Sequence, residues 1–167
     1  LPEGLEERFA ELIRDQALRI SGLLSLKMGG PSVFPHQPDG IWAVVYSGDQ
    51  WSQSTGEDQY RRGIYTFWRR SAPYPAFVNF DAPSREGACT RRPRTNTPLQ
   101  AFVVLNDPVF VEAAQALARR MVRNGGDSTE ERARYGLRLC LCRPPDTAQV
   151  EILTHLYQSE REHYQQD

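Results

Sequence analysis

The chain has 167 residues, of which 40% are apolar and 25% are charged, and its formal net charge is −1. This length and apolar content allow the core of one domain, or of one domain with a long insertion. The near-zero net charge argues against a general nucleic-acid-binding protein. No apolar run approaches the roughly 20 residues of a membrane-spanning helix, so no membrane span is expected in the chain. Leu1 in place of an initiator Met is typical of a fragment.

Apolar residues near the start of the chain recur at three- and four-residue steps, at Leu5, Phe9, Leu12, Ile13, Ile20 and Leu24. This spacing predicts one long amphipathic helix over residues 1–28, because Gly29, Gly30 and Pro31 would stop it.

Residues 29–96 break this pattern. Proline occurs there at positions 31, 35, 38, 73, 75, 83 and 93. A long irregular segment inside a compact chain is uncommon and more often has a function than serves only as a connection. Its strand-like run, GIYTFWRR at 63–70, predicts a small β-hairpin with AFVNF at 76–80.

Residues 97–167 predict a helical group. Helix starts are indicated by Thr97 with Gln100, Asp107 with Pro108, Ser128 with Glu131, and Asp146 with Gln149. Apolar spacing places Cys140, Ile152, Leu153, Leu156 and Tyr157 on inward faces. The sequence therefore predicts a single, mainly α domain: a bundle of about four to five helices with a long irregular insertion.

The basic residues are 19 Arg and one Lys, and they are unevenly placed. Eight Arg lie in residues 61–94 against only Asp81 and Glu86, whereas residues 144–167 are acidic. A guanidinium offers a fork of donors that suits carboxylate, sulfate or phosphate. The candidate ligand-binding residues are Arg61, Arg62, Tyr65, Trp68, Arg69, Asp81, Arg85, Arg91, Arg92, Arg94 and Asn96.

The same arginines have a structural interpretation. An irregular segment has many backbone carbonyls that need donors, and arginines paired with Asp81, Glu86 or Asp107 would hold it in place. On this interpretation, CTRRPRTNTPLQ is chiefly an anchor onto the helix that starts at Thr97.

The aromatic residues of the irregular segment can form either a sugar-binding platform or part of the core. They are Trp42, Trp51, Tyr60, Tyr65, Trp68 and Tyr74. The carboxylates Asp39, Glu57, Asp58 and Asp81 could supply the acid and base of a glycoside hydrolase, but nothing in the sequence fixes their separation.

Cysteine and histidine spacing indicates no metal, haem or disulfide site. Cys89, Cys140 and Cys142 form no C-x-x-C pair and no haem-attachment motif. Cys89 would need a neighbouring base to act as a nucleophile, and His36, His155 and His163 are all distant in sequence. No catalytic residue is identified, and no cofactor is expected in this chain.

Five blocks carry a resemblance that covers nearly the whole chain: IRDQALRISGLLSLKMGGPSVFPHQPDGIW, RRGIYTFWRRSAP, DAPSRE, RTNTPLQAFVVLNDPVFVEAAQALA and LCLCRPPDTAQVEIL. In this order they resemble the planctomycete-type C-terminal domain of unknown function that ends large secreted proteins. The resemblance implies an extracytoplasmic setting (periplasmic, secreted or cell-surface) and a longer parent protein. It also implies a sister planctomycete-type domain as partner, and often haem in a separate cytochrome-c-like module. Cys89 stands one residue later than the resembled pattern has it, which argues against a thiol-specific role.

We therefore expect a non-catalytic extracytoplasmic module that docks a sister domain or binds an anionic glycan through the arginine and aromatic surface. The alternative is part of a polysaccharide-directed or redox enzyme whose active site the sister domain completes. Asp81 and Glu86 discriminate between these functions. If the carboxylates of Asp81 and Glu86 are exposed in a cleft, the enzyme is favoured. If they form ion pairs with arginines, the non-catalytic module is favoured.

Overall fold

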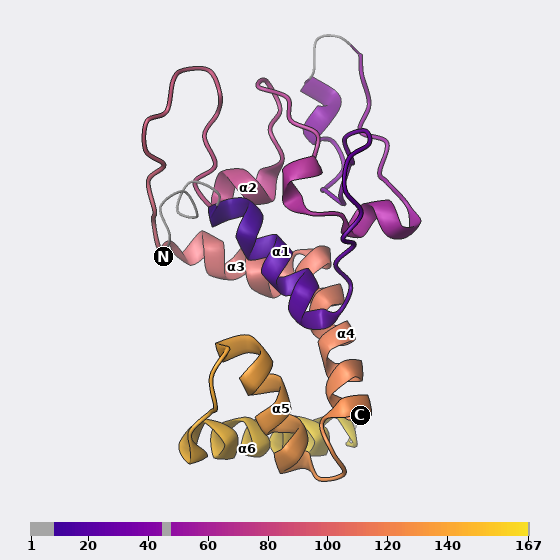
Figure 1. The fold of residues 1–167 in the computed structure, drawn as a ribbon, viewed down its shortest axis with the longest axis vertical. Helices are drawn as coiled ribbons and strands as arrows, with labels where there is room; N and C mark the ends of the chain where they lie inside the picture. Colours follow the sequence, from indigo (N-terminus) through magenta and orange to yellow (C-terminus); the bar gives the residue numbers. More distant parts are fainter. Residues whose placement is uncertain (1–8, 45–47, 167) are drawn as a thin grey trace. The chain divides into compact units, whose positions relative to one another are not determined.

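The computed structural model describes residues 9–44 and 48–166, and the described chain is mainly helical (Figure 1). It divides into two compact units. The first comprises Leu1–Arg19 and Leu23–Ala113, and the second comprises Ile20–Gly22 and Ala114–Asp167. The expected mainly α class is confirmed. That the chain forms a single domain stays a prediction.

Helix α1 spans Phe9–Ser21 and ends earlier than the sequence predicts. Gly22 follows with a φ of +85°, a left-handed conformation that glycine adopts without steric cost. The N–H groups of Leu23 and Leu24 both donate to the Leu18 carbonyl, at 2.9 and 3.0 Å, which closes the last turn. The predicted residues 1–8 of this helix lie outside the described part of the chain.

The irregular segment contains short helical turns in place of the predicted hairpin. These are η2 (Ile41–Val44), η3 (Gly56–Tyr60), η4 (Gly63–Tyr65) and helix α2 (Pro75–Asn79). The hairpin prediction is wrong because one of its strands is partly η4 and the other is α2. Pro75 stands at the start of α2, where a missing N–H costs nothing and the fixed φ favours a helix. Within the described residues, isolated parallel β-bridges join Ser25 with Arg61 and Val33 with Thr66.

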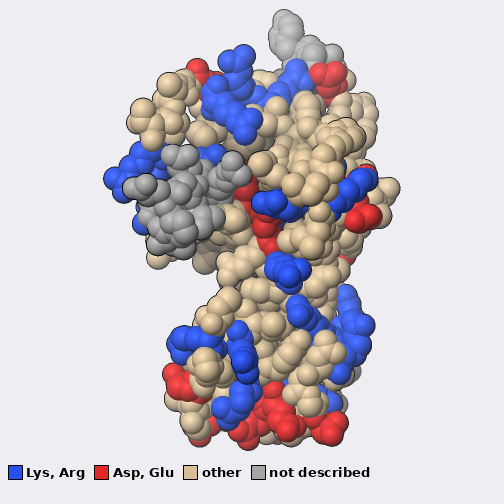
Figure 2. Space-filling view, viewed as in Figure 1, with Lys and Arg blue, Asp and Glu red and all other residues tan. Residues whose placement is uncertain are grey.

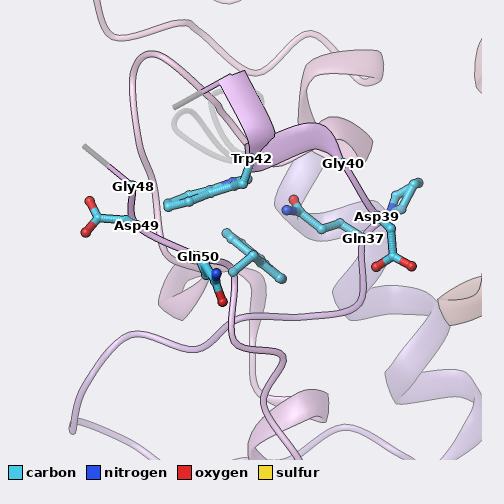
Figure 3. A pocket seen from close by; sticks show the side chains of 9 residues that line it. Gln37, Asp39, Gly40, Trp42, Gly48, Asp49 and Gln50 are labelled. Carbon is cyan, nitrogen blue, oxygen red and sulfur yellow. The ribbon is translucent and has the colours of Figure 1, made fainter. Parts of the chain in front are cut away.

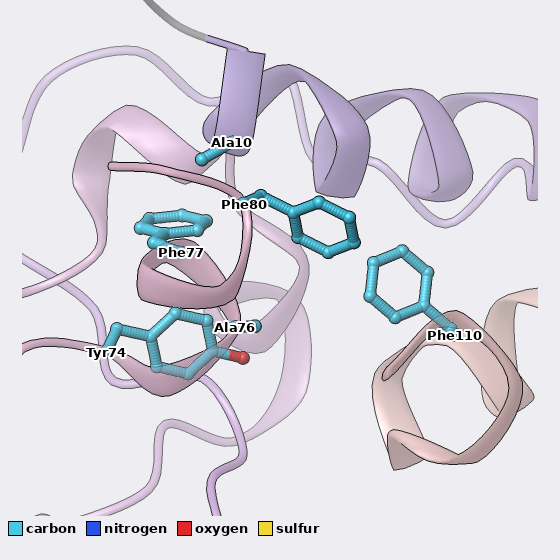
Figure 4. Close-up of a cluster of buried hydrophobic side chains, with 6 residues drawn as sticks. All are labelled: Ala10, Tyr74, Ala76, Phe77, Phe80 and Phe110. Carbon is cyan, nitrogen blue, oxygen red and sulfur yellow. The ribbon is translucent and has the colours of Figure 1, made fainter. Parts of the chain in front are cut away.

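The largest hydrophobic cluster of the first unit is centred on α2 (Figure 4). Helix α1 contributes Ala10, and Phe110 comes from the first turn of α4 (Pro108–Asn124). Phe80 faces Phe110 with ring centroids 6.5 Å apart. The remaining buried members are Tyr74, Ala76 and Phe77. A five-residue helix that the sequence did not predict thus supplies much of this core.

Helices α3 (Pro98–Asn106), α5 (Thr129–Leu141) and α6 (Thr147–Tyr164) begin where their predicted caps place them. Full capping boxes are present at Thr97 with Gln100, Ser128 with Glu131, and Asp146 with Gln149. At the start of α4, the Asp107 carboxylate accepts a hydrogen bond of 2.9 Å from the Val109 N–H. The predicted helix starts are confirmed. The sequence could identify them because a cap is an interaction between residues that are close in sequence.

In the second unit, α5 packs on α6 and buries Ala133 and Val150. Several side chains of α5 and α6 that the sequence predicts to face inward are exposed. Ile152 is 70% exposed and Leu156 is 53% exposed, Tyr157 is also exposed, and only Leu153 of the predicted set is half-buried. Cys140 is exposed too, because it lies in the last turn of α5, beyond the buried positions of that helix. Helical periodicity identifies an apolar face, but the neighbouring elements decide how much of that face is covered.

None of the helices in the described residues is, by itself, long and apolar enough to cross a membrane. Helices α3 and α4 meet that criterion only as a pair, and the pair is bent by 58°.

Candidate functional site

Arg61 is buried inside the first unit and holds the irregular segment together. Its side chain, 1% exposed, donates to the Gly29 carbonyl and, at 3.0 Å, to the Pro31 carbonyl. The guanidinium carbon lies 3.9 Å from the centroid of the Tyr65 ring. The Tyr65 hydroxyl in turn accepts a 2.8 Å hydrogen bond from the Gly29 N–H. Arg61 and Tyr65 are therefore brought together, but as a clamp on residues 29–31 and not on a solvent-facing surface.

A second buried arginine, Arg14 of α1, was not among the predicted site residues. It donates to the Arg61 carbonyl at 2.7 Å and to the Gln59 carbonyl at 2.6 Å. Burial lowers the pKa of Arg14. Its position on an otherwise apolar helix face was the sequence signal that could have identified it.

Asp15 of α1 joins the same framework. Its carboxylate accepts a 2.6 Å hydrogen bond from the Gly63 N–H and lies 3.8 Å from the Arg62 Nε. Burial raises the pKa of Asp15, and the hydrogen bond from Gly63 partly opposes that shift. Arg62 thus lies next to Asp15 of α1.

Residues 81–97 form a loop that is closed at its base. The Asp81 carboxylate accepts hydrogen bonds from the Thr95 N–H at 2.7 Å and from the Thr95 hydroxyl at 2.9 and 3.0 Å. The buried Gln100 side chain donates to the Asn79 carbonyl at 2.9 Å and to the Thr95 hydroxyl at 3.1 Å. Arg92 reaches the Glu11 carboxylate with bonds of 2.8 and 3.3 Å. Sequence reasoning missed Gln100 as a link, although it is the third residue of the Thr97 capping box.

The loop also carries exposed members of the predicted set. The Arg85 guanidinium lies 4.8 Å from the Trp68 ring centroid, and Arg91, Arg94 and Asn96 are exposed. On the face drawn in Figure 2, the described basic residues are scattered among neutral and acidic ones. The predicted arginines thus take part in several separate local contacts, and their role in ligand binding stays a prediction.

A pocket forms instead between two turns, residues 37–42 and 48–51 (Figure 3). Its volume is about 420 Å³, within the roughly 300–1,000 Å³ of small-molecule sites. The lining residues are Gln37, Pro38, Asp39, Gly40, Trp42, Gly48, Asp49, Gln50 and Trp51. None of the eleven predicted site residues lines this pocket, although Arg69 pairs with Asp49 at 2.6 Å.

The two indole rings of the pocket are held by the surrounding core. The Trp51 Nε1 donates to the Pro35 carbonyl at 2.8 Å, and its ring stacks on Tyr74 with centroids 6.1 Å apart. Trp42 meets Trp51 at a centroid distance of 5.4 Å and an interplanar angle of 57°. The Arg69 guanidinium lies 5.2 Å from the Trp42 ring centroid. The rings are thus fixed before any ligand arrives.

Polar groups surround these rings. Gln37 is only 8% exposed, and its amide points toward Trp42 (Figure 3). The Gln37 Oε1 and the Trp42 Nε1 are buried without a hydrogen-bond partner in the described chain. Asp39, Asp49 and Gln50 are exposed at the rim. The pocket therefore combines aromatic rings with carboxylate and amide groups that can accept or donate hydrogen bonds.

Three of the four carboxylates considered for glycoside hydrolysis are each bonded to a different partner. Glu57 accepts a 2.6 Å bond from the Ser25 hydroxyl, Asp58 pairs with Lys27 at 3.3 Å, and Asp81 is bonded to Thr95. Of these candidates, Asp39 alone lines the pocket.

Asp81 and Glu86 were expected either to be exposed in a cleft, as in an enzyme, or to pair with arginines, as in a non-catalytic module. The contacts of these two residues match neither expectation. Asp81 is bonded to Thr95, as described above, and Glu86 is exposed. Within residues 9–44 and 48–166, no group of three or more His, Cys, Asp or Glu side chains could hold a metal ion.

Comparison with known proteins identifies a family but no characterised relative. No curated protein and no solved structure matches the chain. Residues 6–157 match the model of the PSD1 family, described as a protein of unknown function (DUF1553). Because that match covers most of the sequence, the chain belongs to the PSD1 family of proteins of unknown function.

Proposed function

We propose that the chain is a non-catalytic, carbohydrate-binding module of a larger extracytoplasmic protein, and that it binds its ligand in the pocket that Trp42 and Trp51 help to line. One observation carries this proposal: two indole rings, 5.4 Å apart and inclined at 57°, stand in a pocket rimmed by carboxylate and amide groups.

The chemistry of a sugar matches these groups. The C–H bonds on one face of a pyranose ring carry partial positive charge and pack on the electron-rich face of an indole ring. Its hydroxyls donate to carboxylates such as Asp39 and exchange hydrogen bonds with amides such as Gln50. Binding also benefits from rings that are already fixed, because little side-chain freedom is then lost.

Titration calorimetry against a panel of oligosaccharides tests the proposal, with tryptophan fluorescence as a second readout. Asp39→Ala and Gln50→Ala remove exposed rim groups and are expected to weaken binding by about tenfold each, the loss for one hydrogen bond of roughly 1–1.5 kcal/mol. Glu160→Gln, an exposed carboxylate on α6, is the matched control and should bind like the wild type. A panel without a single binder, at millimolar protein, would refute carbohydrate binding.

Docking of a sister domain is a second candidate function, and the exposed apolar side chains of helix α3 support it. This helix contains no charged residue, and its side chains Leu99, Phe102 and Leu105 are 56%, 63% and 71% exposed. Apolar side chains clustered on a surface often mark an interface. Hydrogen exchange provides the test: α3 amides should exchange more slowly in the parent protein than in the isolated chain, with α5 amides as the internal control. Equal exchange of α3 in the two proteins would contradict docking at this helix.

The extracytoplasmic setting and any haem in another domain rest on the resemblance of the sequence blocks alone. Cell fractionation with an antibody against this chain tests the setting. A cytosolic parent protein would overturn it.

A further inference from the structure

We infer that the pocket lined by Trp42 and Trp51 selects uncharged saccharides and rejects uronate and sulfated ones. This inference rests on the proposed carbohydrate-binding function, because it names the class of ligand for the same site. It departs from the sequence-based expectation of an anionic glycan held by arginines.

The charges that face the pocket are the first argument. Asp39 and Asp49 lie on either side of Trp42 (Figure 3). Arg69 pairs with a lining carboxylate, because its Nη1 lies 2.6 Å from the Asp49 Oδ2. Arg69 is not itself a lining residue, and its guanidinium also lies over the Trp42 ring. The Asp49 charge is thus balanced, whereas Asp39 is exposed at the rim, and the lining formed by the described residues contains no basic side chain.

An anionic sugar would place a second negative charge beside Asp39. Like charges repel more strongly where water is partly excluded, as next to the indole rings that line this pocket. The donors that could offset this repulsion are amide and indole N–H groups, which carry no net charge. A neutral sugar meets no such repulsion, and its hydroxyls can donate hydrogen bonds to the Asp39 carboxylate.

The arginines best placed to bind an anion lie elsewhere. Arg91 and Arg94 are exposed on the loop of residues 81–97, and neither lines the pocket. Binding of an anionic glycan at that loop would depend strongly on ionic strength, whereas binding of a neutral sugar in the pocket would not. The two sites therefore have different signatures in solution.

The test uses matched ligand pairs and the whole chain. Gluco-, galacto- and manno-configured oligosaccharides are each compared with the oligomer of the same linkage whose C6 hydroxymethyl group is replaced by a carboxylate. At least one neutral member should bind ten times or more tighter than its uronate counterpart, with an affinity that salt leaves unchanged. The variant Asp39→Asn should reduce the ratio of neutral-sugar affinity to uronate affinity, because it weakens binding of the neutral sugar and removes the repulsion of the uronate. Arg94→Ala is the control and should leave the ratio unchanged.

Two outcomes overturn the inference and differ in their meaning. If the uronates bind as tightly as the neutral sugars, or tighter, and lose affinity in Arg91→Ala or Arg94→Ala, the ligand is anionic and the arginine loop is its site. The chain would then still bind carbohydrate. If no member of any pair binds, the inference fails together with the proposed carbohydrate-binding function.

Discussion

Arg92 and Glu11 are 81 positions apart in sequence, yet their side chains form a two-pronged ion pair with bonds of 2.8 and 3.3 Å. The pair joins the exposed loop of residues 81–97 to helix α1. Both side chains are largely shielded from water, at 16% and 13% exposed, so the pair is neither a surface bridge nor a fully buried one.

Loss of the Arg92 side chain should therefore destabilise the fold. Arg92→Ala is expected to lower the free energy of unfolding by about 1–3 kcal/mol, between the values for surface and buried pairs. Arg94→Ala, two residues away and exposed, should change it by less than about 0.5 kcal/mol. Chemical denaturation of both variants measures the difference. If both have the wild-type midpoint, the pair does not anchor the loop.

Arg61 should not tolerate lysine. Its two donated bonds and its contact with Tyr65 use the planar fork of the guanidinium, and a lysine ammonium cannot reproduce that geometry. Arg61→Lys is expected to cost about 2 kcal/mol of stability, since hydrogen bonds from a charged group to the Gly29 and Pro31 carbonyls are lost or weakened. Arg62→Lys, whose charge is partly exposed, serves as the control and should cost less than about 0.5 kcal/mol. Equal thermal melts of the two variants would contradict the clamp.

The cap of helix α3 gives a third prediction. The Thr97 hydroxyl accepts a hydrogen bond from the Gln100 N–H, and the Gln100 Oε1 accepts one from the Thr97 N–H. Thr97→Ala should destabilise the fold by about 0.5–2 kcal/mol, the usual loss for an N-cap. Thr55 precedes η3 but makes no side-chain cap bond, so Thr55→Ala should have almost no effect. A denaturation series on both threonines decides whether the side-chain bond is the cause.

The cap of helix α5 predicts a dependence on pH. Hydrogen bonds from the Ser128 N–H, the Ser128 hydroxyl and the Asp127 N–H lower the pKa of Glu131. A carboxylate with a lowered folded-state pKa adds stability above its unfolded-state pKa, and loses that contribution as the pH falls through its folded-state value. Stability should therefore decline over this acidic window in the wild type, and less steeply in Glu131→Gln. Carboxyl NMR titration should show the Glu131 pKa rising in Ser128→Ala; an unchanged pKa would exclude the cap as its cause.

The sequence by itself determined the features that depend on neighbouring residues. Helix starts at Thr97, Ser128 and Asp146 follow from contacts three residues apart, so they could be identified without any knowledge of the fold. The mainly α class was equally accessible, because repeated apolar spacing needs no partner to be recognised. The interpretation of CTRRPRTNTPLQ as an anchor agrees with the contacts of Arg92 and Thr95.

The tertiary structure decided which side chains meet across long stretches of chain. Residues 76–80 have the composition of a strand, yet Pro75 starts the short helix α2 (Pro75–Asn79), whose Phe77 lies in the same hydrophobic cluster as Ala10 of α1. Arg61 is buried because carbonyls 30 and 32 residues away need its donors. The pocket has the same origin. Trp42 and Trp51 were visible in the sequence as aromatic residues, but their inclination and the Asp39 carboxylate beside them depend on two turns that only packing brings together.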